Sequence, residues 1–376
     1  MSYRLLYKLL LARIPPEDAH ALASVTMRAV AAVPGMRPAM RRLAFPRDAT
    51  LEVHALGQVF PSPLGVAAGV DKGASWFEAL GAIGFGFVEV GTVTAVPQRG
   101  EPKPRVVRLP EHRALLNKMG FPNPGAKEFA RRLRKRTGGT IVGVNVGKSK
   151  VASLDQAAAD YRATVREVAP FADYIVLNIS SPNTPGLREM QAVERLRPLL
   201  VEVQQELNAG SGRVPLLIKL SPDLGDQDVD AIADLALERE LDGIVAVNTT
   251  VNRAAIAASS QRAKDLDGGG VSGPPLRPRA LEILRRLYRR VDHKLVLISV
   301  GGIETPGDAW DRIAAGATLI QANTGFVYGG PAWPARINRA LGRRVRAAGA
   351  ASIQDLVGAA ARPELAANAQ SELASR

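Results

Sequence analysis

The chain is 376 residues long, carries a formal net charge of +13 and contains no cysteine. The missing cysteines exclude disulfides, thiol nucleophiles and cysteine-ligated zinc or iron–sulfur sites. The charge favours an anionic partner such as nucleic acid, an anionic membrane or a small anion, although an Arg-rich proteome would explain it equally well. A (β/α)8 barrel of roughly 250 residues would fit this length and leave segments at both ends.

Residues 1–45 differ from the rest because short apolar helices are studded with basic side chains there. We expect helices over residues 3–11 and 16–33, the second with Leu22, Val25 and Val33 on one face together with Ala29. The pattern fits either a membrane-surface hairpin or a helical hairpin packed on the main domain. No apolar run reaches the roughly 18 residues of a spanning helix and no secretory signal is recognisable, so we expect peripheral attachment only.

From about residue 50, short apolar runs alternate with amphipathic helical stretches. Eight such runs occur, at residues 64–68, 85–90, 140–146, 174–178, 216–219, 243–247, 295–300 and 318–322. Eight β-then-α units favour an α/β fold with a closed parallel TIM barrel, and a doubly wound open sheet is the alternative.

These patterns divide the chain into three parts. An N-terminal helical extension covers residues 1–45, the (β/α)8 barrel covers 46–345, and a tail at 346–376 is predicted to be a terminal helix with a loose end. Residues 97–124 and 251–277 are predicted insertions in the barrel, the first of which crosses its top.

Polar side chains gather where the predicted strands end. Residues 178–186 read NISSPNTPG and place short polar groups on a stiffened loop after the fourth strand, at the barrel face that carries chemistry. Four asparagines and two lysines end or follow strands, namely Asn145, Asn178, Asn183, Asn248, Lys72 and Lys219. A lone asparagine is more often a turn or capping residue. Together, these side chains suit a planar heterocycle with imide groups and a negative charge.

A phosphate site is expected after the last two strands. Gly301, Gly302, Thr324 and Gly325 occur there, with Gly273 before them, and backbone N–H groups in these loops of a barrel often bind phosphate. Residues 69–73 read GVDKG and do not match the GxGxxG dinucleotide fingerprint. The sequence therefore favours a mononucleotide, with FMN as the natural candidate.

Ser181 is the candidate reactive side chain of the loop at 178–186. A Ser-His-Asp hydrolase is not expected, because no GxSxG elbow is present and none of the four histidines ends a predicted strand. As a base, Ser181 would need a further proton acceptor, such as water or a threonine. The alternative is a loop hydroxyl that caps the next turn.

These residues resemble dihydroorotate dehydrogenases of the quinone-linked class, flavoenzymes of pyrimidine synthesis, over about residues 3–345. The motifs that carry the resemblance lie at 67–72 (AAGVDK), 117–123 (NKMGFPN), 143–148 (GVNVGK), 178–186 and 300–303 (VGGI). The soluble class generally uses a cysteine as base, whereas this chain has Ser181. The extension at 1–45 also resembles the quinone-linked class, where it forms the membrane-facing quinone tunnel.

The resemblance implies FMN as the cofactor and dihydroorotate as the substrate. It implies FMN contacts for Ala68, Gly69, Lys72, Thr92, Asn145, Asn178, Lys219, Val247, Gly273, Gly302, Asn323 and Thr324. It implies dihydroorotate contacts for Lys72, Asn117, Lys118, Met119, Gly120, Phe121, Asn178, Asn183, Asn248 and Thr249. Ser181 is implied to take the C5 proton while a hydride passes from C6 to flavin N5, with Lys219 stabilising the reduced flavin. His20 and Arg108 are implied at the quinone tunnel, and no metal is implied.

Two positions depart from the family pattern. Similar enzymes often have Tyr where this chain has Asn323, so an aromatic ring between flavin and quinone is lost. They often have Thr where this chain has Val247, so a hydroxyl contact to FMN is lost.

We therefore expect a dihydroorotate:quinone oxidoreductase that docks peripherally on an anionic membrane surface, at the cytoplasmic face of a bacterial inner membrane. The alternative enzyme is a soluble FMN barrel that passes electrons to fumarate or NAD, and residues 1–45 argue against it. A nucleic-acid partner is not expected, because the chain has no binding motif and only 5% aromatic residues.

Overall fold

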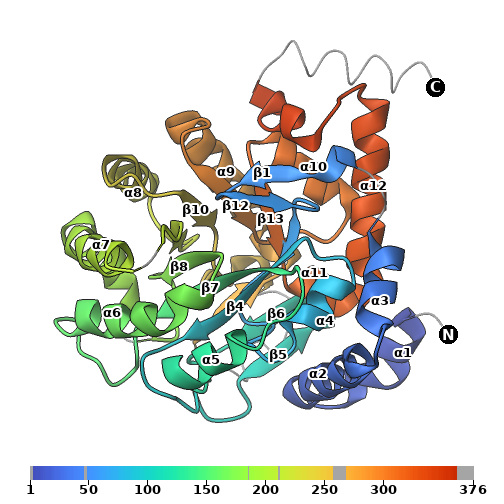
Figure 1. Ribbon diagram of the computed structural model, residues 1–376, viewed down its shortest axis with the longest axis horizontal. Helices are drawn as coiled ribbons and strands as arrows, with labels where there is room; N and C mark the ends of the chain where they lie inside the picture. The colour runs from blue at the N-terminus through green and yellow to red at the C-terminus, as the bar shows by residue number, and fades with distance from the viewer. Residues whose placement is uncertain (1–2, 46–48, 185, 211, 257–267, 362–376) are drawn as a thin grey trace.

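Eight parallel strands close into a barrel, which confirms the predicted fold class (Figure 1). The computed structural model describes residues 3–361 except 46–48, 185, 211 and 257–267. Part of the predicted insertion at 251–277, position 185 of the NISSPNTPG motif and the tail from 362 onward therefore lie outside the described residues. In barrel order the strands are β3 (Leu64–Val66), β4 (Phe87–Val93), β7 (Ile141–Gly147), β8 (Tyr174–Asn178), β9 (Leu216–Leu220), β10 (Gly243–Ala246), β12 (Val296–Val300) and β13 (Leu319–Ala322).

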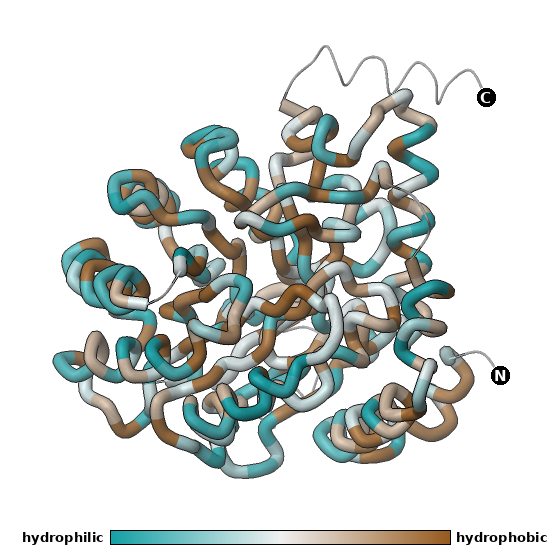
Figure 2. Tube along the Cα trace, in the orientation of Figure 1, coloured by the Kyte–Doolittle hydropathy of each residue, from teal (hydrophilic) through white to brown (hydrophobic). Residues whose placement is uncertain are grey.

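Amphipathic helices surround the barrel and bury one face each against it. Brown and teal residues alternate along them in Figure 2, as expected for helices with one solvated face. In α9, for example, Ile283, Leu284 and Leu287 are fully buried. The helices are α4 (Phe77–Ala82), α5 (Ala126–Leu133), α6 (Ala157–Val168), α7 (Val193–Asn208), α8 (Asp226–Glu238), α9 (Arg277–Val291), α10 (Pro306–Ala314), α11 (Thr324–Gly329) and α12 (Trp333–Ala347).

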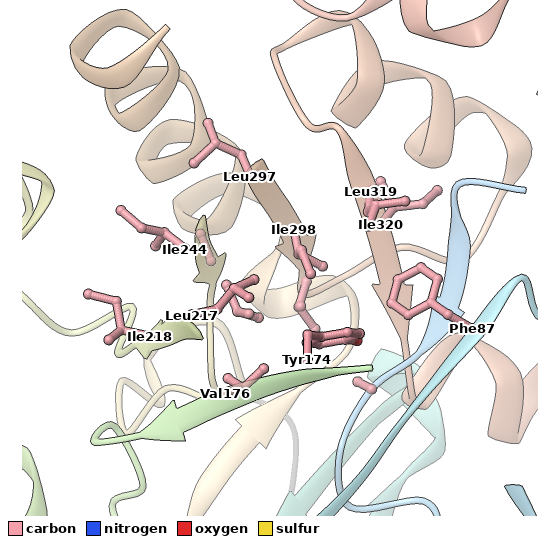
Figure 3. Close-up of a cluster of buried hydrophobic side chains, with 14 of the residues drawn as sticks. Phe87, Tyr174, Val176, Leu217, Ile218, Ile244, Leu297, Ile298, Leu319 and Ile320 are labelled. Carbon is pink, nitrogen blue, oxygen red and sulfur yellow. The ribbon is translucent and has the colours of Figure 1, made fainter. Parts of the chain in front are cut away.

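Two aromatic rings fill the barrel interior among branched aliphatic side chains (Figure 3). The ring centroids of Phe87 and Tyr174 lie 6.4 Å apart, and neither residue is exposed. Glycines on neighbouring strands make room for them. A Cβ on Gly65 would lie 2.4 Å from the Phe87 ring, and one on Gly143 would lie 2.1 Å from the Tyr174 ring. The GVNVG pattern of β7 is thus partly a packing requirement.

The N-terminal extension contains one helix more than predicted. It consists of α1 (Tyr3–Leu9), α2 (Pro16–Ala32) and α3 (Met36–Ala44), and Gly35 adopts a positive φ of 78° between the last two. Helix α2 contacts α3, α4 and β5, yet it buries no residue fully. Its predicted apolar face is exposed, with Leu22 at 49% and Val25 at 61%. None of the described helices is both long and apolar enough to cross a bilayer.

The predicted excursion at 97–124 is confirmed as a separate sheet on the barrel. Strands β5 (Val106–Leu109) and β6 (Ala114–Asn117) pair antiparallel, and β11 (Gly270–Ser272) from the second insertion pairs with β6. A small hairpin of β1 (Val53–Ala55) and β2 (Gln58–Phe60) precedes the barrel. The two predicted insertions therefore meet, although the paired residues Asn117 and Gly270 lie 153 positions apart in the sequence.

The predicted terminal helix after residue 346 is wrong for the part of the tail that the structure describes. Helix α12 already ends at Ala347, and Gly349 then adopts a left-handed φ of 65° that an α-helix does not continue through. Two 3₁₀ turns follow, at Ile353–Leu356 and Ala359–Ala361.

The glycine packing yields a stability prediction. Gly143→Ala should lower the free energy of unfolding by about 1–3 kcal/mol, because the new methyl group overlaps the buried Tyr174 ring. Gly212→Ala is the matched control, since no atom lies within 4 Å of its Cβ position. Urea unfolding of both variants measures the difference. Equal midpoints would show that the barrel interior tolerates the overlap.

Candidate active site

A cavity of about 750 Å³ opens at the carboxyl ends of the barrel strands and extends to the N-terminal helices. Asn178 and Lys219 line its barrel end, whereas Tyr3, His20 and Leu22 line its helical end. Its size falls in the range of small-molecule and cofactor sites. The extension and the barrel thus share one cavity, as the predicted tunnel requires.

The asparagines of the rim hold one another in place. The Asn178 amide donates to Thr92 Oγ1 and to Asn145 Oδ1, both at 3.0 Å, and the Thr92 hydroxyl donates to Asn145 Oδ1 at 2.6 Å. Asn248 donates to Asn178 Oδ1 at 3.3 Å and to Ser180 Oγ at 3.0 Å. Because these bonds join strands β4, β7 and β8 to the residues after β10, they fix the orientation of the amides that face the cavity.

A buried carboxylate lies beneath this amide layer. Glu89 on β4 is fully buried, and it accepts hydrogen bonds from Asn145 Nδ2 at 2.8 Å and from Gln321 Nε2 at 2.7 Å. Lys219 Nζ lies 3.3 Å from Glu89 Oε1. Lys219 and Gln321 line the cavity, and Glu89 does not. The sequence analysis missed Glu89, although an acidic residue inside the apolar run at 85–90 was a signal that could have found it.

Lys72 is presented by a loop that wraps around a carboxylate. Asp71, buried after β3, accepts backbone N–H groups from Gly73 at 3.3 Å, Ser75 at 2.9 Å and Trp76 at 2.8 Å. Lys72 faces the cavity. Burial lowers the pKa of Lys72 to about 8, and the carboxylates of Glu17 and Asp71 partly offset that effect. The loop thus holds a cation whose charge changes near neutral to mildly alkaline pH.

Ser181 lies at the cavity wall in the loop after β8. Its side chain is buried, at 4% exposure, and its Oγ accepts the backbone N–H of Asn183 at 3.2 Å. Asn183 Nδ2 donates to the carbonyl of Asn117 at 3.4 Å, across to the excursion sheet. Asn183 Oδ1 is buried and has no hydrogen-bond partner among the described residues. That acceptor fits a ligand with an N–H donor.

The loops after β12 and β13 bring backbone close to the cavity. Gly302 has a φ of 75°, and a Cβ on it would lie 2.6 Å from the Cβ of Arg277. A Cβ on Gly325 would lie 2.3 Å from the carbonyl oxygen of Ile303. Thr324 Oγ1 shares a hydrogen bond of 2.8 Å with Ser272 Oγ. The first N–H groups of α11 take no partner within that helix, so this wall offers donors suited to an anion.

The helical end of the cavity is joined to the barrel by polar contacts. His20 Nε2 lies 2.7 Å from the carbonyl oxygen of Val70, and its ring packs edge-on against Trp76. Burial lowers the pKa of His20 to about 4, and the charge of Lys72 acts in the same direction. His20 is therefore neutral at physiological pH and donates from Nε2. Arg108 Nη1 donates to the carbonyl of Ile14 at 2.7 Å.

The structure brings almost all of the sequence-predicted site residues to this one cavity. Those that line it are His20, Ala68, Gly69, Lys72, Thr92, Arg108, Asn117, Met119, Gly120, Phe121, Asn178, Ser181, Asn183, Lys219, Val247, Asn248, Thr249, Gly273, Gly302, Asn323 and Thr324. Asn145 and Lys118 are not among its lining residues. Asn145 instead supports Thr92 and Asn178 from behind. Besides Glu89, the sequence analysis missed Gln321 and the tyrosines Tyr3 and Tyr7.

Comparisons with known proteins identify the family of this chain. Residues 50–345 match the family described as dihydroorotate dehydrogenase. The dihydroorotate dehydrogenase (quinone) of Thermobifida fusca is 52% identical over 95% of this chain and 96% of its own length. That of Mycobacterium tuberculosis is 51% identical over 95% and 98%. A crystal structure of the Eimeria tenella enzyme in complex with ferulenol has a TM-score of 0.85, with 35% identity over 96% of this chain and 99% of that chain.

Proposed function

The chain belongs to the dihydroorotate dehydrogenase family, as a quinone-dependent enzyme of pyrimidine biosynthesis that uses FMN, and from this premise we propose roles for the residues around its cavity. The observation that carries the proposal is the single cavity that runs from the amide layer of the barrel to the N-terminal helices. One end of it suits a flavin with a pyrimidine substrate, and the other suits an apolar quinone.

The barrel end fits FMN. The unpartnered acceptor Gln321 Oε1 and the cation of Lys219 suit the pyrimidine edge of the ring, which carries both N–H donors and carbonyl oxygens. The wall at Gly302 and Thr324 suits the phosphate. When bound, FMN accepts the hydride of dihydroorotate and passes the electrons to quinone. The proposed FMN contacts are Ala68, Gly69, Lys72, Thr92, Asn145, Asn178, Lys219, Val247, Gly273, Gly302, Asn323 and Thr324.

Dihydroorotate is held by charge and by amides. Lys72 binds its carboxylate, and the unpartnered Asn183 Oδ1 accepts a ring N–H. The other proposed contacts are Asn117, Lys118, Met119, Gly120, Phe121, Asn178, Asn248 and Thr249. Asn178 and Asn248 are already oriented by hydrogen bonds to their neighbours, so little side-chain entropy is lost when the substrate binds.

Ser181 removes the C5 proton. Its Oγ already accepts one N–H, from Asn183, so a lone pair and the hydroxyl hydrogen remain to receive the proton and to pass one on to water or a threonine hydroxyl. Burial of Ser181 at 4% exposure keeps bulk water from the reacting carbon.

The quinone enters through the extension at residues 1–45, with His20 and Arg108 at its path. Exposed apolar side chains of the helices, among them Leu9, Leu43 and Val25, would insert at a membrane surface, and exposed Arg13 and Arg28 would meet anionic headgroups. We place the protein at the cytoplasmic face of a bacterial inner membrane, attached peripherally, with the barrel at 46–345 as the catalytic part and 346–376 as a tail. Fumarate or NAD as acceptor is not supported, because the relatives are named quinone enzymes.

An anaerobic absorption spectrum tests the proposed function. The purified protein should show flavin bands that bleach when dihydroorotate is added and return when a quinone follows. Flavin bands that do not bleach would support FMN as the cofactor but refute dihydroorotate as the substrate. A protein without flavin bands, even after incubation with FMN, would refute the cofactor site.

Replacing Ser181 separates its chemical role from a structural one. Ser181→Ala should retain FMN and its stability but lose about 10²–10⁴-fold in the rate of flavin reduction at pH 7, because the general base is gone. Ser181→Cys should restore part of that rate, since a thiolate is also a base. Stopped-flow bleaching gives both rates. Unchanged reduction in Ser181→Ala would leave Ser181 a loop hydroxyl only.

The lowered pKa of Lys72 predicts a pH effect on product binding. Below pH 8 the lysine is charged, so the dissociation constant of orotate should be constant. Above about pH 8 it should rise by up to roughly tenfold per unit as the charge is lost. Titration of the flavin spectrum with orotate at several pH values measures it. In Lys72→Gln the binding should be weaker and free of this rise, and a rise that persists there would assign it to another group.

A further inference from the structure

Glu89 stands out because no part of the proposed chemistry uses it. Its carboxylate is fully buried inside the barrel, where Val, Ile and Leu are the usual residues. Three other strands converge on it, since Asn145 on β7, Lys219 on β9 and Gln321 on β13 all contact this side chain on β4.

Stability alone does not account for such an arrangement. Taking a carboxylate and an ammonium group out of water is expensive, and apolar side chains of similar size are often as stable in their place. The hydrogen bonds from Asn145 and Gln321 and the ion pair with Lys219 offset the desolvation cost of Glu89. The same ion pair fixes the position of Lys219, which lines the cavity. The ion pair therefore delivers an oriented charge to the site.

We propose that Glu89 is a positioning residue that tunes the reduction potential of the bound flavin through Lys219. This inference rests on the proposed function only in so far as the barrel end binds FMN. Reduction adds negative charge to the flavin ring, and a cation at Lys219 stabilises it. The negative charge of Glu89, 3.3 Å from Lys219, weakens this stabilisation of the reduced flavin and fixes the position of the ammonium group. The reduction potential of the flavin is therefore lower with the ion pair than it would be with Lys219 alone.

A near-isosteric substitution isolates the charge. In Glu89→Gln, the new amide oxygen still accepts from Asn145 and Lys219. Its new NH₂ group can donate to Gln321 Oε1 if the Gln321 amide turns over, and that oxygen has no other partner among the described residues. The variant therefore keeps the side-chain shape and the hydrogen bonds from Asn145 and Lys219 while it loses one negative charge. Glu128→Gln, which removes a partly exposed carboxylate on α5 that does not contact the cavity, is the control.

The measurement is the two-electron midpoint potential of the FMN-loaded protein, titrated with dithionite and a reference dye. Glu89→Gln should raise the equilibrium constant for reduction about tenfold or more, a shift of about 30 mV per factor of ten. Glu89→Asp moves the carboxylate away from Lys219 by the length of one methylene group, so it should raise the reduction potential by a smaller amount. Glu128→Gln should match the wild type.

The outcomes separate this inference from the function on which it rests. A wild-type protein that holds no FMN would refute the proposed function itself. FMN-loaded wild type and Glu89→Gln with equal potentials, or a lower potential in Glu89→Gln, would overturn the role of Glu89 and leave the function standing. If Glu89→Gln fails to fold, Glu89→Asp decides. A rise supports the proposal, and an unchanged or lower potential overturns it.

Discussion

The polar layer at the carboxyl end of the barrel depends on one buried carboxylate. Glu89 accepts hydrogen bonds from Asn145, Gln321 and Lys219, which lie on three other strands. Asn145 in turn accepts hydrogen bonds from Thr92 and Asn178. The side chains that donate to Glu89 are held in place because Glu89 itself is held in place. The arrangement of the polar groups at the cavity floor therefore depends on a carboxylate that does not line the cavity. A half-satisfied buried network would destabilise the barrel. Among the described residues, Gln321 Oε1 and Asn183 Oδ1 are buried oxygens without a hydrogen-bond partner, and both belong to residues that line the cavity.

Charged residues of the N-terminal extension interact electrostatically with residues of the barrel cavity. Glu17 on α2 forms an ion pair of 2.9 Å with Arg105, and its charge also acts on Lys72. His20 on the same helix lies against the carbonyl of Val70, two residues before Lys72. Displacement of α2 would thus alter the charge state of Lys72 and loosen the loop around it. The helices with exposed apolar side chains are coupled in this way to Lys72, the residue proposed to hold the substrate carboxylate.

Much of this could be predicted from the sequence, because the strands of a parallel barrel are short apolar runs and their ends are marked by polar and glycine residues. Asn178, Ser181 and Lys219 were found by that rule. Helix α3 was missed because Pro38 and the basic residues around it hide its periodicity. Glu89 was missed because strand-end reasoning looks at the rim, whereas its role arises from contacts between strands 56 to 232 residues apart. The terminal helix was misplaced because an alanine-rich composition favours a helix but does not reveal the left-handed turn at Gly349.

The unpartnered acceptors suggest how a largely apolar cavity gains selectivity from a few buried polar atoms. A buried acceptor that no donor satisfies destabilises the protein by about 1–3 kcal/mol. In the proposed substrate contact, a ring N–H at Asn183 Oδ1 would recover that free energy, whereas an analogue without the N–H would leave the oxygen buried and unpaired. A site rejects a ligand that lacks a required hydrogen-bonding group more strongly than one that lacks a methylene group, because the polar partner is then left buried and unpaired. Under the proposed substrate contacts, such an unsatisfied acceptor selects ligands by their hydrogen-bonding edge.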